Sequence, residues 1–530
     1  MSMPGETLTN LIKQLDQRLS WSHRISLMVI ILLGFLLRWY SLYEGHAFIL
    51  VTIRDEVMAI KFALAFLAGD PNTWYIGQPA LNQGNIPGPL WTMLVAAFYK
   101  LGGNSAEGAM FWIMVLNSLV IYLVYLFATG LLAARYALLT ALFYALSPWP
   151  IYYAAGLYNP MILALLGVLL FWALWQTINV ERSRAIFWVM LLAAMVLQFH
   201  MIGIFYYPLI LLLLWITPCR LNLPWLSAGI VAGVLLYVPY FIGEITHHWA
   251  NLHGVLHGGN KFSFGIFKIL TIPPEMLTNH PGGWLGISTA EFKDFGNRFF
   301  GSYLVLLFLN LISFGLALAF VYGFIRKFYS LLRDAQFNFR TALENNRLYV
   351  FLGVLLVLPL LLYMLTGKAY ASRYSIFIFP LLFLLPALYL ERIAKARIKR
   401  IVLYSLAAMF ICNVYLVLVF YADQNRKLTT ADQYMPAFYK LKALYSALRR
   451  DAGPDKTIVL DTRRYTIVGN KYSEIATDAI SNYIDAYETH RAPSATPRQP
   501  RHYVLVDALA KVPAKASIVF RDNGAVIYTP

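Results

Sequence analysis

Three charged residues, Arg54, Asp55 and Glu56, stand together directly after an apolar run, in the stretch TIRDEVMAI at residues 52–60. Only 13% of the chain is charged, so such a group is uncommon here. A carboxylate at the mouth of a hydrophobic segment can accept a proton from a substrate hydroxyl. Asp55 is equally suited to be the N-cap of a following helix, with Glu56 as its first-turn acid. Spacing alone leaves both roles open.

Four amide side chains follow in the stretch IGQPALNQGNIPGPLW: Gln78, Asn82, Gln83 and Asn85. Amides of this kind can bind sugar hydroxyls, and they can equally be ordinary loop amides. The prolines and glycines of IPGPLW are typical of a helix start rather than a helix interruption.

Histidines gather in a later polar stretch, at His247, His248, His253 and His257. His253 and His257 are four residues apart, so on a helix they share one face and can hold a divalent metal. The stretch has no acid at a matching position, which makes ordinary surface histidines the alternative.

The elements that must position these residues are membrane helices. The chain of 530 residues is 59% hydrophobic, well above a soluble protein, and it has about half the usual share of charge. Apolar windows recur near the roughly 20 residues that a spanning helix needs. We therefore predict a polytopic α-helical membrane protein with about eleven spans. They lie roughly at 24–42, 109–129, 135–149, 157–177, 184–199, 201–217, 225–243, 302–325, 348–366, 373–391 and 400–421.

The basic residues indicate the orientation of these spans. The stretches 326–347 and 392–400 are dense in Arg and Lys, and with eleven spans both fall on the side of the N-terminus. The positive-inside rule makes that side cytoplasmic. It also explains the formal charge of +17 without a nucleic-acid partner. Cys219 and Cys412 lie in or beside apolar segments and indicate no disulfide framework.

Two large loops then face outward, at about 43–108 and 244–301. In the first, residues 56–69 carry a helical apolar face and end at Gly69, which predicts a helix in the membrane interface. Its apolar face consists of Val57, Ile60, Leu64 and Leu67. Arg38, inside the first span, needs a partner; one of the nearby acids or a bound phosphate would serve.

Residues 422–530 differ from the membrane module at 1–421, because they are polar and charged. We predict a small soluble α/β domain on the outer face. The expected strands are 457–461, 502–508 and a hairpin turning at Asn523-Gly524; the expected helices are 435–450 and 473–490, and 491–501 is an expected flexible loop.

These sparse motifs together resemble the GT-C class of membrane glycosyltransferases, in particular the protein-mannosyltransferase and aminoarabinose-transferase-like group. The resemblance rests on the DE pair after the first span, on GNIPGPLW, on LSPWPIYYAAGLYNPMI at 146–162 and on GKAYASRYSIFIFPLLFLLPALYL at 367–390. It covers about residues 24–421. Many relatives have a histidine before a double proline, where this chain has Asn85 and a glycine between the prolines.

The resemblance implies transfer of one sugar from a polyprenyl-phosphate carrier to an acceptor hydroxyl outside the cytoplasm, with inversion at the sugar carbon. It makes Asp55 the general base, with Glu56 as its partner or as a helix-start acid. The implied acceptor is lipid A or another glycolipid, a polysaccharide or an exported protein. The implied location is the bacterial inner membrane, with the C-terminal domain in the periplasm.

The departing phosphate needs preorganised positive charge, and cations are scarce on the outer side of the spans. The candidates for this role are Arg373, Lys368, Tyr370, Tyr374 and Arg54. Ordinary flanking cations that reach the headgroups are the alternative. The candidates for contact with the sugar or the acceptor are Asn82, Gln83, Asn85, Tyr153, Asn159 and His200. No cofactor is expected beyond a possible divalent metal.

Two other classes of protein fit the hydropathy pattern. A transporter or flippase of lipid-linked sugars would also have about eleven spans, but transporters place ionisable residues at mid-bilayer, where this chain has few. A non-catalytic envelope assembly protein would leave the charged motifs as membrane anchors.

Overall fold

The computed structural model describes most of the chain. The described residues are 21–44, 53–79, 85–154, 156–257, 273–277, 289–366, 372–429, 438–453, 456–461, 484, 499–507, 517–522 and 525–529. At residues 53–55 and 372–374 the backbone is described and the side chains are not.

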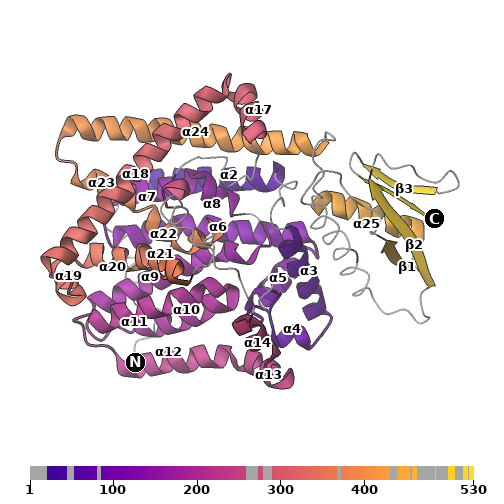
Figure 1. The fold of residues 1–530 in the computed structure, drawn as a ribbon, viewed down its shortest axis with the longest axis horizontal. Helices are drawn as coiled ribbons and strands as arrows, with labels where there is room; N and C mark the ends of the chain where they lie inside the picture. The colour runs from indigo at the N-terminus through magenta and orange to yellow at the C-terminus, as the bar shows by residue number, and fades with distance from the viewer. Residues whose placement is uncertain are drawn as a thin grey trace.

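The first half of the chain is a bundle of helices (Figure 1). It consists of α2 (Trp21–Glu44), α3 (Ile53–Leu67), α4 (Asn72–Tyr75), α5 (Leu90–Leu101), α6 (Ala106–Thr129), α7 (Ala134–Leu146), α8 (Pro148–Tyr152), the 3-10 helix η2 (Asn159–Ile162), α9 (Leu163–Asn179), α10 (Ala185–Phe199), η3 (Met201–Phe205), α11 (Tyr207–Ile216), α12 (Leu223–Leu236), α13 (Val238–Thr246) and α14 (Ala250–His257).

The second half completes the bundle and adds a separate sheet. Its helices are α17 (Thr289–Phe300), α18 (Tyr303–Asp334), α19 (Phe339–Asn345), α20 (Arg347–Leu356), α21 (Leu358–Thr366), η4 (Ser372–Ile378), α22 (Phe379–Leu382), α23 (Leu385–Arg392), α24 (Ala396–Thr429) and α25 (Phe438–Ala452). The strands are β1 (Lys456–Asp461), β2 (Gln499–Asp507), β3 (Ser517–Asp522) and β4 (Ala525–Thr529).

In the described part of the chain, six helical segments are long and apolar enough to cross a membrane. They are Trp21–Glu44, Ala106–Thr129, Asn159–Asn179, Tyr303–Asp334, Ser375–Arg392 and Ala396–Asp423. The bent pair α12 and α13 makes a seventh if it is one span. The remaining predicted spans fall on the shorter apolar helices α7, α10, α11 and α20. The predicted positions therefore match helices, and the total of eleven spans stays a prediction.

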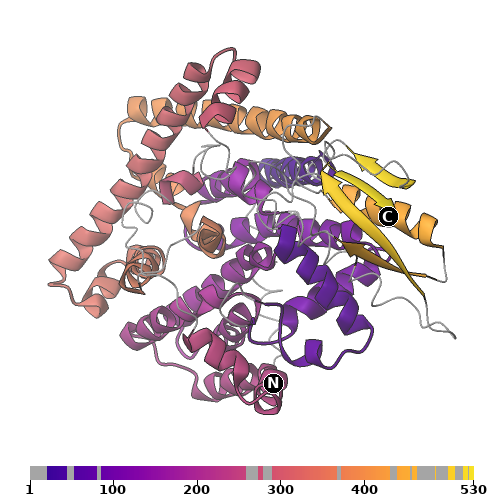
Figure 2. The same cartoon turned by 45° about the vertical axis from the view of Figure 1, so that its right-hand side comes forward.

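Burial separates the central helices from those that face lipid. The segment Ser375–Arg392 is 83% buried, whereas the windows in α18 and α24 are only 28% and 33% buried. Figures 1 and 2 show α18 and α24 along the outside of the bundle. Apolar side chains such as Phe308 and Ile411 remain exposed on them, as expected for surfaces in contact with acyl chains.

Arg38 in α2 finds its partners inside the bundle rather than at the charged motifs. The guanidinium is fully buried and donates to the carbonyls of Gly34, Tyr144 and Ala145 at 3.0–3.2 Å. Two of these carbonyls lie at the C-terminal end of α7, where the helix dipole favours a cation. The expected pairing of Arg38 with an acid is therefore not needed to satisfy its charge.

Helix α3 corrects one expectation about Asp55. The helix begins at Ile53, so Asp55 lies in its first turn and is not its N-cap. Val57, Ile60 and Ala63 are fully buried, and α3 packs against α5. The helix ends at Leu67, two residues before the predicted stop at Gly69, whose φ of +86° is the left-handed conformation that glycine adopts most easily.

The prolines before α5 also behave as predicted, because the helix begins directly after Pro89. Gly88 between the two prolines has φ +119°, and a Cβ there would lie 2.5 Å from Oε1 of Gln198. Gln198 is fully buried and donates from Nε2 to the carbonyl of Leu236 at 2.6 Å. The unusual glycine of this motif is therefore required by the close approach of α10.

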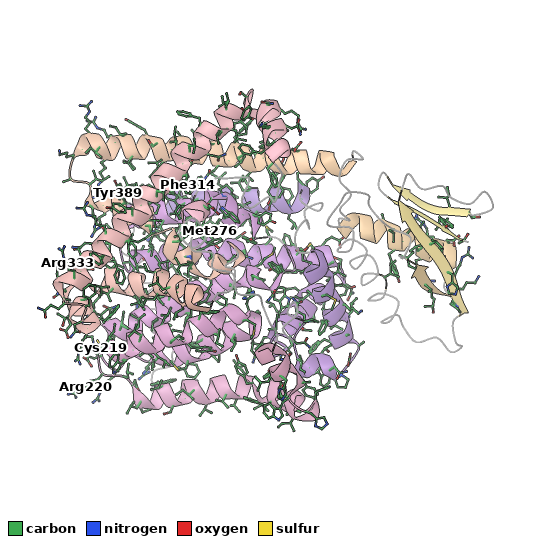
Figure 3. All side chains as sticks on the ribbon, in the orientation of Figure 1. Cys219, Arg220, Met276, Phe314, Arg333 and Tyr389 are labelled. Atoms are coloured by element: carbon green, nitrogen blue, oxygen red, sulfur yellow. The ribbon has the colours of Figure 1, made fainter. Side chains whose placement is uncertain are left out.

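The segment predicted as the second outer loop, at about 244–301, contacts the helix bundle at two further places. Residues 273–277 form a helical turn whose Met276 is fully buried and is labelled over the helix bundle in Figure 3. Further along, Arg298 of α17 donates to Oδ1 of Asp423 in α24 at 2.9 Å. The Asp423 side chain is fully buried, so this ion pair holds α17 against the end of the last membrane helix.

The C-terminal domain is a four-stranded sheet in the order β1-β2-β4-β3 with α25 packed on it. Strands β1 and β2 are parallel, and β3 and β4 form the predicted antiparallel hairpin. Residues Asn523 and Gly524, and the predicted helix 473–490 except Ile484, lie outside the described residues. In Figures 1 and 2 the sheet lies beyond one end of the bundle.

One part of the domain differs from the expectation of a flexible loop at 491–501. Strand β2 already begins at Gln499, and Pro500 pairs with Thr457 of β1. Proline is tolerated in a strand whose other side is unpaired, and β4 pairs with β2 only from Val504 onward.

Candidate functional site

Glu56 is the described member of the charged motif, and it points into the protein. Its side chain is in the first turn of α3 and only 2% of the residue is exposed. Oε1 of Glu56 lies beside Gly156, close enough that a Cβ on Gly156 would be 2.5 Å away. The same Cβ would be 2.7 Å from Cε of Met161 in η2. The start of α3 therefore packs directly on the loop between α8 and η2.

Four tyrosines form a cluster, and one of them, Tyr152, lies near this carboxylate. Burial raises the pKa of Tyr152 well above its usual value, and the nearby Tyr153, Tyr421 and Glu56 raise it further. Tyr158 contributes in the same direction. These groups come from α3, α8, the following loop and the end of α24. Tyr152 is therefore a neutral phenol that can donate a hydrogen bond at any physiological pH.

The tyrosine cluster is tied to the first and last membrane helices. Tyr421 is 3% exposed and hydrogen-bonds with Ser41 of α2. Ser41 in turn donates to the carbonyl of Arg38 at 2.8 Å. Helix α8 also packs against both α2 and α24. The cluster thus sits where helices from the two ends of the membrane module meet.

The aromatic stretch at 146–162 supports the cluster from one side. Trp149 stacks on Tyr153 with ring centroids 5.9 Å apart and an interplanar angle of 20°. Its indole Nε1 donates to the carbonyl of Glu275 at 2.9 Å, which brings the second outer loop to the same place. Asn117 of α6 donates to the carbonyl of Ala154 at 3.2 Å and thereby holds the loop after α8 against α6.

The stretch continues into η2, where Asn159 has a structural partner. Its Nδ2 donates to the carbonyl of Phe199 at 2.6 Å, and the residue is 5% exposed. Its amide therefore joins η2 to the end of α10, and its role in sugar or acceptor binding stays a prediction.

Helix η4, which carries Arg373 and Tyr374, packs against η2 and α9. The approach is close, because a Cβ on Gly167 of α9 would lie 2.2 Å from the carbonyl oxygen of Phe377. The side chains of Arg373 and Tyr374, like Lys368 and Tyr370, lie outside the described residues. The segment 156–162 nevertheless connects the two motifs, because Glu56 of α3 lies against Gly156 and η4 packs against η2.

Asn85 is held by an amide from the second outer loop. Nδ2 of Asn251 donates to the Asn85 carbonyl at 3.1 Å, and Oδ1 of Asn251 accepts from the Asn85 backbone N–H. Asn251 also donates to the Tyr240 hydroxyl at 3.1 Å. A bridge between Pro79 and Asn85 closes the segment that contains Asn82 and Gln83, which lie outside the described residues.

His200 caps a short helix. Its Nδ1 accepts from the backbone N–H of Ile202 at 3.0 Å, at the start of η3. This bond fixes a tautomer in which Nε2 carries the proton. Any contact with a substrate would therefore use Nε2.

Within the described residues, no group of three or more His, Cys, Asp or Glu side chains is arranged to hold a metal ion. His253 lies exposed on α14, and the side chain of His257 lies outside the described residues. A metal on this pair stays a prediction.

Reasoning from the sequence missed Tyr152, Tyr158 and Tyr421 around Glu56, and it missed Asn251. Tyr152 and Tyr158 lie in the aromatic stretch 146–162 on which the family resemblance rests, so the sequence could have indicated them as candidates. Tyr421 and Asn251 come from distant elements, and no local signal distinguishes them from other membrane-helix or loop residues.

Comparison with known proteins adds to this geometry. No protein-family model matches the chain, and no curated protein matches it in sequence. The crystal structure of ArnT from Cupriavidus metallidurans bound to undecaprenyl phosphate is similar, with a TM-score of 0.55 and 13% identity over 95% of this chain and 97% of that chain. The same protein in the apo state gives 0.53 and 13% identity, over 89% and 92% of the two chains.

The chain has the GT-C fold. The alignment with ArnT covers 95% of this chain. The C-terminal domain at 422–530 is much longer than the remaining 5%, so the alignment includes most of this domain. With its apolar spans, the protein is a multi-pass membrane protein. The predicted fold class is thereby confirmed.

Proposed function

We propose that the protein is a membrane glycosyltransferase that moves a monosaccharide from a polyprenyl-phosphate carrier to an acceptor hydroxyl on the outer face. The observation that carries the proposal is the arrangement around η2. Glu56, in the first turn of α3, lies against Gly156 in the loop that leads into η2, and η4, the helix of Arg373, packs against η2. The GT-C fold, shared with a protein bound to undecaprenyl phosphate, supports it.

In the proposed reaction Asp55 accepts the proton of the acceptor hydroxyl. The acceptor oxygen forms a bond to the anomeric carbon of the sugar while the bond from that carbon to the phosphate oxygen breaks. The electron pair leaves with the polyprenyl phosphate, and the sugar carbon is inverted. Glu56, buried among tyrosines, holds the first turn of α3 and thereby orients Asp55.

The developing charge on the phosphate needs fixed donors. In our proposal Arg373 and Lys368 supply the cations, Tyr370 and Tyr374 add hydroxyl donors, and Arg54 is a further candidate. Guanidinium groups can bind two phosphate oxygens at once. Asn85 and the neighbouring Asn82 and Gln83 would contact the sugar or the acceptor, together with Tyr153, Asn159 and His200.

The lipid tail of the carrier must remain in an apolar environment. An apolar cavity of about 300 Å³ lies between α10, α11, α12 and α13 and would accept part of a prenyl chain. Its lining residues are Met190, Ala193, Ala194, Tyr207, Ile210, Leu211, Ile230, Gly233, Val234, Tyr237 and Phe241. The Tyr207 and Tyr237 hydroxyls donate to backbone carbonyls at 3.0 and 2.9 Å, which leaves the wall apolar.

The acceptor would be a component of the envelope: lipid A, another glycan or an exported protein. The test uses purified protein in lipid nanodiscs with radiolabelled polyprenyl-phosphate sugars and extracted envelope acceptors. Transfer is measured as label bound covalently to the acceptor. Asp55→Asn should reduce the rate by roughly 100- to 10,000-fold, the usual contribution of a general base.

Glu344→Gln is the matched control, because this exposed carboxylate lies on α19, away from α3 in Figure 1. It should leave the rate unchanged. Equal rates for Asp55→Asn and the wild type would remove Asp55 from the base role. A labelled lipid that crosses the bilayer without covalent transfer would instead favour a flippase.

A further inference from the structure

Two cations converge on one tyrosine at the N-terminus of α7, far from the site around Glu56. The guanidinium carbon of Arg135 lies 4.8 Å from the centre of the Tyr136 ring. Nζ of Lys399, in the first turn of α24, lies 5.1 Å from the same centre and donates to the Tyr136 hydroxyl. Tyr136 is 5% exposed, so it fixes both cations from within the bundle.

No acid neutralises these two cations in the described part of the chain. Neither Arg135 nor Lys399 takes part in an ion pair there, and the first turns of α7 and α24 contain no acidic residue. A cation near a helix N-terminus also opposes the helix dipole. The arrangement therefore leaves an uncompensated positive charge that an anion would stabilise.

The surroundings increase this charge. Four exposed basic residues follow one another from the end of α23 to the start of α24, and both helices pack against α7. They are Arg392, Lys395, Arg397 and Arg400. Arg392 is itself held over the Tyr349 ring at 4.1 Å. Glu391 is the single acid in the stretch from 391 to 400.

Apolar side chains are exposed on α24 beside Lys399. Leu403, one turn further along the same face of α24, is 40% exposed, and Ile398 next to Lys399 is 45% exposed. Such a run of exposed apolar side chains on a membrane helix faces acyl chains. The cations and the exposed apolar side chains together match the two parts of a phospholipid. The cations can bind its phosphate, and the apolar side chains can contact its acyl chains.

We propose that Arg135, Tyr136 and Lys399 bind the phosphate group of an anionic phospholipid in the leaflet on the side of the basic loops. The guanidinium can pair with two phosphate oxygens and the ammonium with a third position. The acyl chains then lie along Ile398 and Leu403 of α24. This site is independent of the proposed transfer reaction.

The test measures lipid retention by the full-length protein, released from detergent and analysed by native mass spectrometry. Phosphatidylglycerol is compared with phosphatidylcholine, for the wild type and for the double variant Arg135→Gln, Lys399→Gln. Each basic residue near an anionic surface contributes about fivefold to binding. The double variant should therefore bind phosphatidylglycerol at least tenfold more weakly, and its binding of phosphatidylcholine should be unchanged.

The control is the double variant Arg333→Gln, Arg340→Gln, which removes the same charge from another basic segment. Both of these arginines have acidic partners, Asp334 and Glu344, at 3.3 and 3.6 Å. The control should retain phosphatidylglycerol nearly as well as the wild type. Equal losses in the two double variants would show that only net charge matters and would overturn the proposal.

Two further measurements separate the remaining outcomes. If the double variant is poorly folded, Lys399→Gln alone is compared with Lys327→Gln, and equal binding would again overturn the site. Inorganic phosphate is added at millimolar concentration as a competitor. Complete displacement of the lipid by phosphate would show that the site takes a soluble anion, which contradicts a phospholipid site.

Discussion

Oε1 of Glu56 lies so close to Gly156 that a Cβ at residue 156 would be 2.5 Å from this carboxylate oxygen. Gly156→Ala should therefore turn the Glu56 carboxylate away from its present position, while the backbone of α3 stays in place. A misplacement of about 1 Å can reduce a rate about 100-fold, so we expect a fall of that order in sugar transfer.

The matched control for this change is Gly315→Ala in α18. A Cβ at Gly315 has nothing within 4 Å, and alanine favours the helix. This variant should keep the full transfer rate and be slightly more stable. A Gly156→Ala protein with the wild-type rate would contradict a functional role for the position of Glu56.

Asn251 should act as a positioning residue for Asn85. Asn251→Ala removes both bonds to the backbone of Asn85, which is half-buried, so the cost should be below the roughly 1–3 kcal/mol of a fully buried unpaired group. If Asn85 contacts the sugar, KM for the polyprenyl-phosphate sugar should rise, while the affinity for polyprenyl phosphate without a sugar stays the same. Both are measured by titration in nanodiscs.

The neighbouring Leu252→Ala, on an exposed side chain of the same helix, is the control and should leave both values unchanged. A general loss of folded protein would lower the number of active molecules and not KM. A wild-type KM in Asn251→Ala would therefore argue against the positioning role.

The Arg298–Asp423 ion pair should contribute to stability. Asp423 is buried and Arg298 is 28% exposed, so Arg298→Gln leaves a buried carboxylate with less compensation. Removing one partner of a buried pair costs about 3–5 kcal/mol, and the partial exposure of Arg298 should place the effect at or below the lower end. The change is measured as the shift in thermal unfolding in detergent.

Arg340→Gln is the comparison, because its pair with Glu344 is exposed on both sides. Exposed pairs contribute about 0–1 kcal/mol, so the melting temperature should barely change. Equal shifts in the two variants would mean that the contact between α17 and α24 adds nothing to stability.

The C-terminal domain should lose stability in alkali through Tyr503. Burial, and then the hydrogen bond to Asp451, raises the pKa of Tyr503. An unfolded tyrosine ionises near pH 10, so the folded state is favoured below that pH and loses this advantage as pH rises above it. In Tyr503→Phe the free energy of unfolding should fall less steeply above about pH 10 than in the wild type. It is measured by denaturant unfolding at each pH.

At neutral pH the same variant loses the bond at 2.8 Å from the Tyr503 hydroxyl to Asp451. Arg501 remains paired with Asp451 at 2.8 Å, so the loss should be near 1 kcal/mol. An unchanged alkaline decline in Tyr503→Phe would assign the pH dependence to other groups.

The sequence predicts those parts of the molecule that depend on local patterns. Gly69 follows the end of α3 at Leu67, and Pro89 directly precedes α5, because a left-handed glycine and a proline at a helix start act within a few residues. Asp55 was misplaced as an N-cap, because the first turn extends further back, to Ile53.

Contacts between distant segments are different. Asn251 and Asn85 are 166 residues apart, and Arg298 and Asp423 are 125 apart. Each residue is an ordinary polar residue in its own stretch, so only the packed bundle reveals the pair. Pro500 also depends on a distant segment. It can lie in β2 because β4 pairs with β2 only from Val504 onward and leaves one side of Pro500 unpaired.

The position of Tyr421 has a consequence for how the protein is made. Glu56 belongs to the first outer loop, whereas Tyr421 belongs to the last membrane helix. During synthesis the N-terminal helices enter the bilayer long before α24 is translated. The tyrosine cluster can close only when the final helix has been inserted, so a nascent or prematurely terminated chain would have an open, inactive centre. Activity would then mark a chain whose translation and insertion are complete.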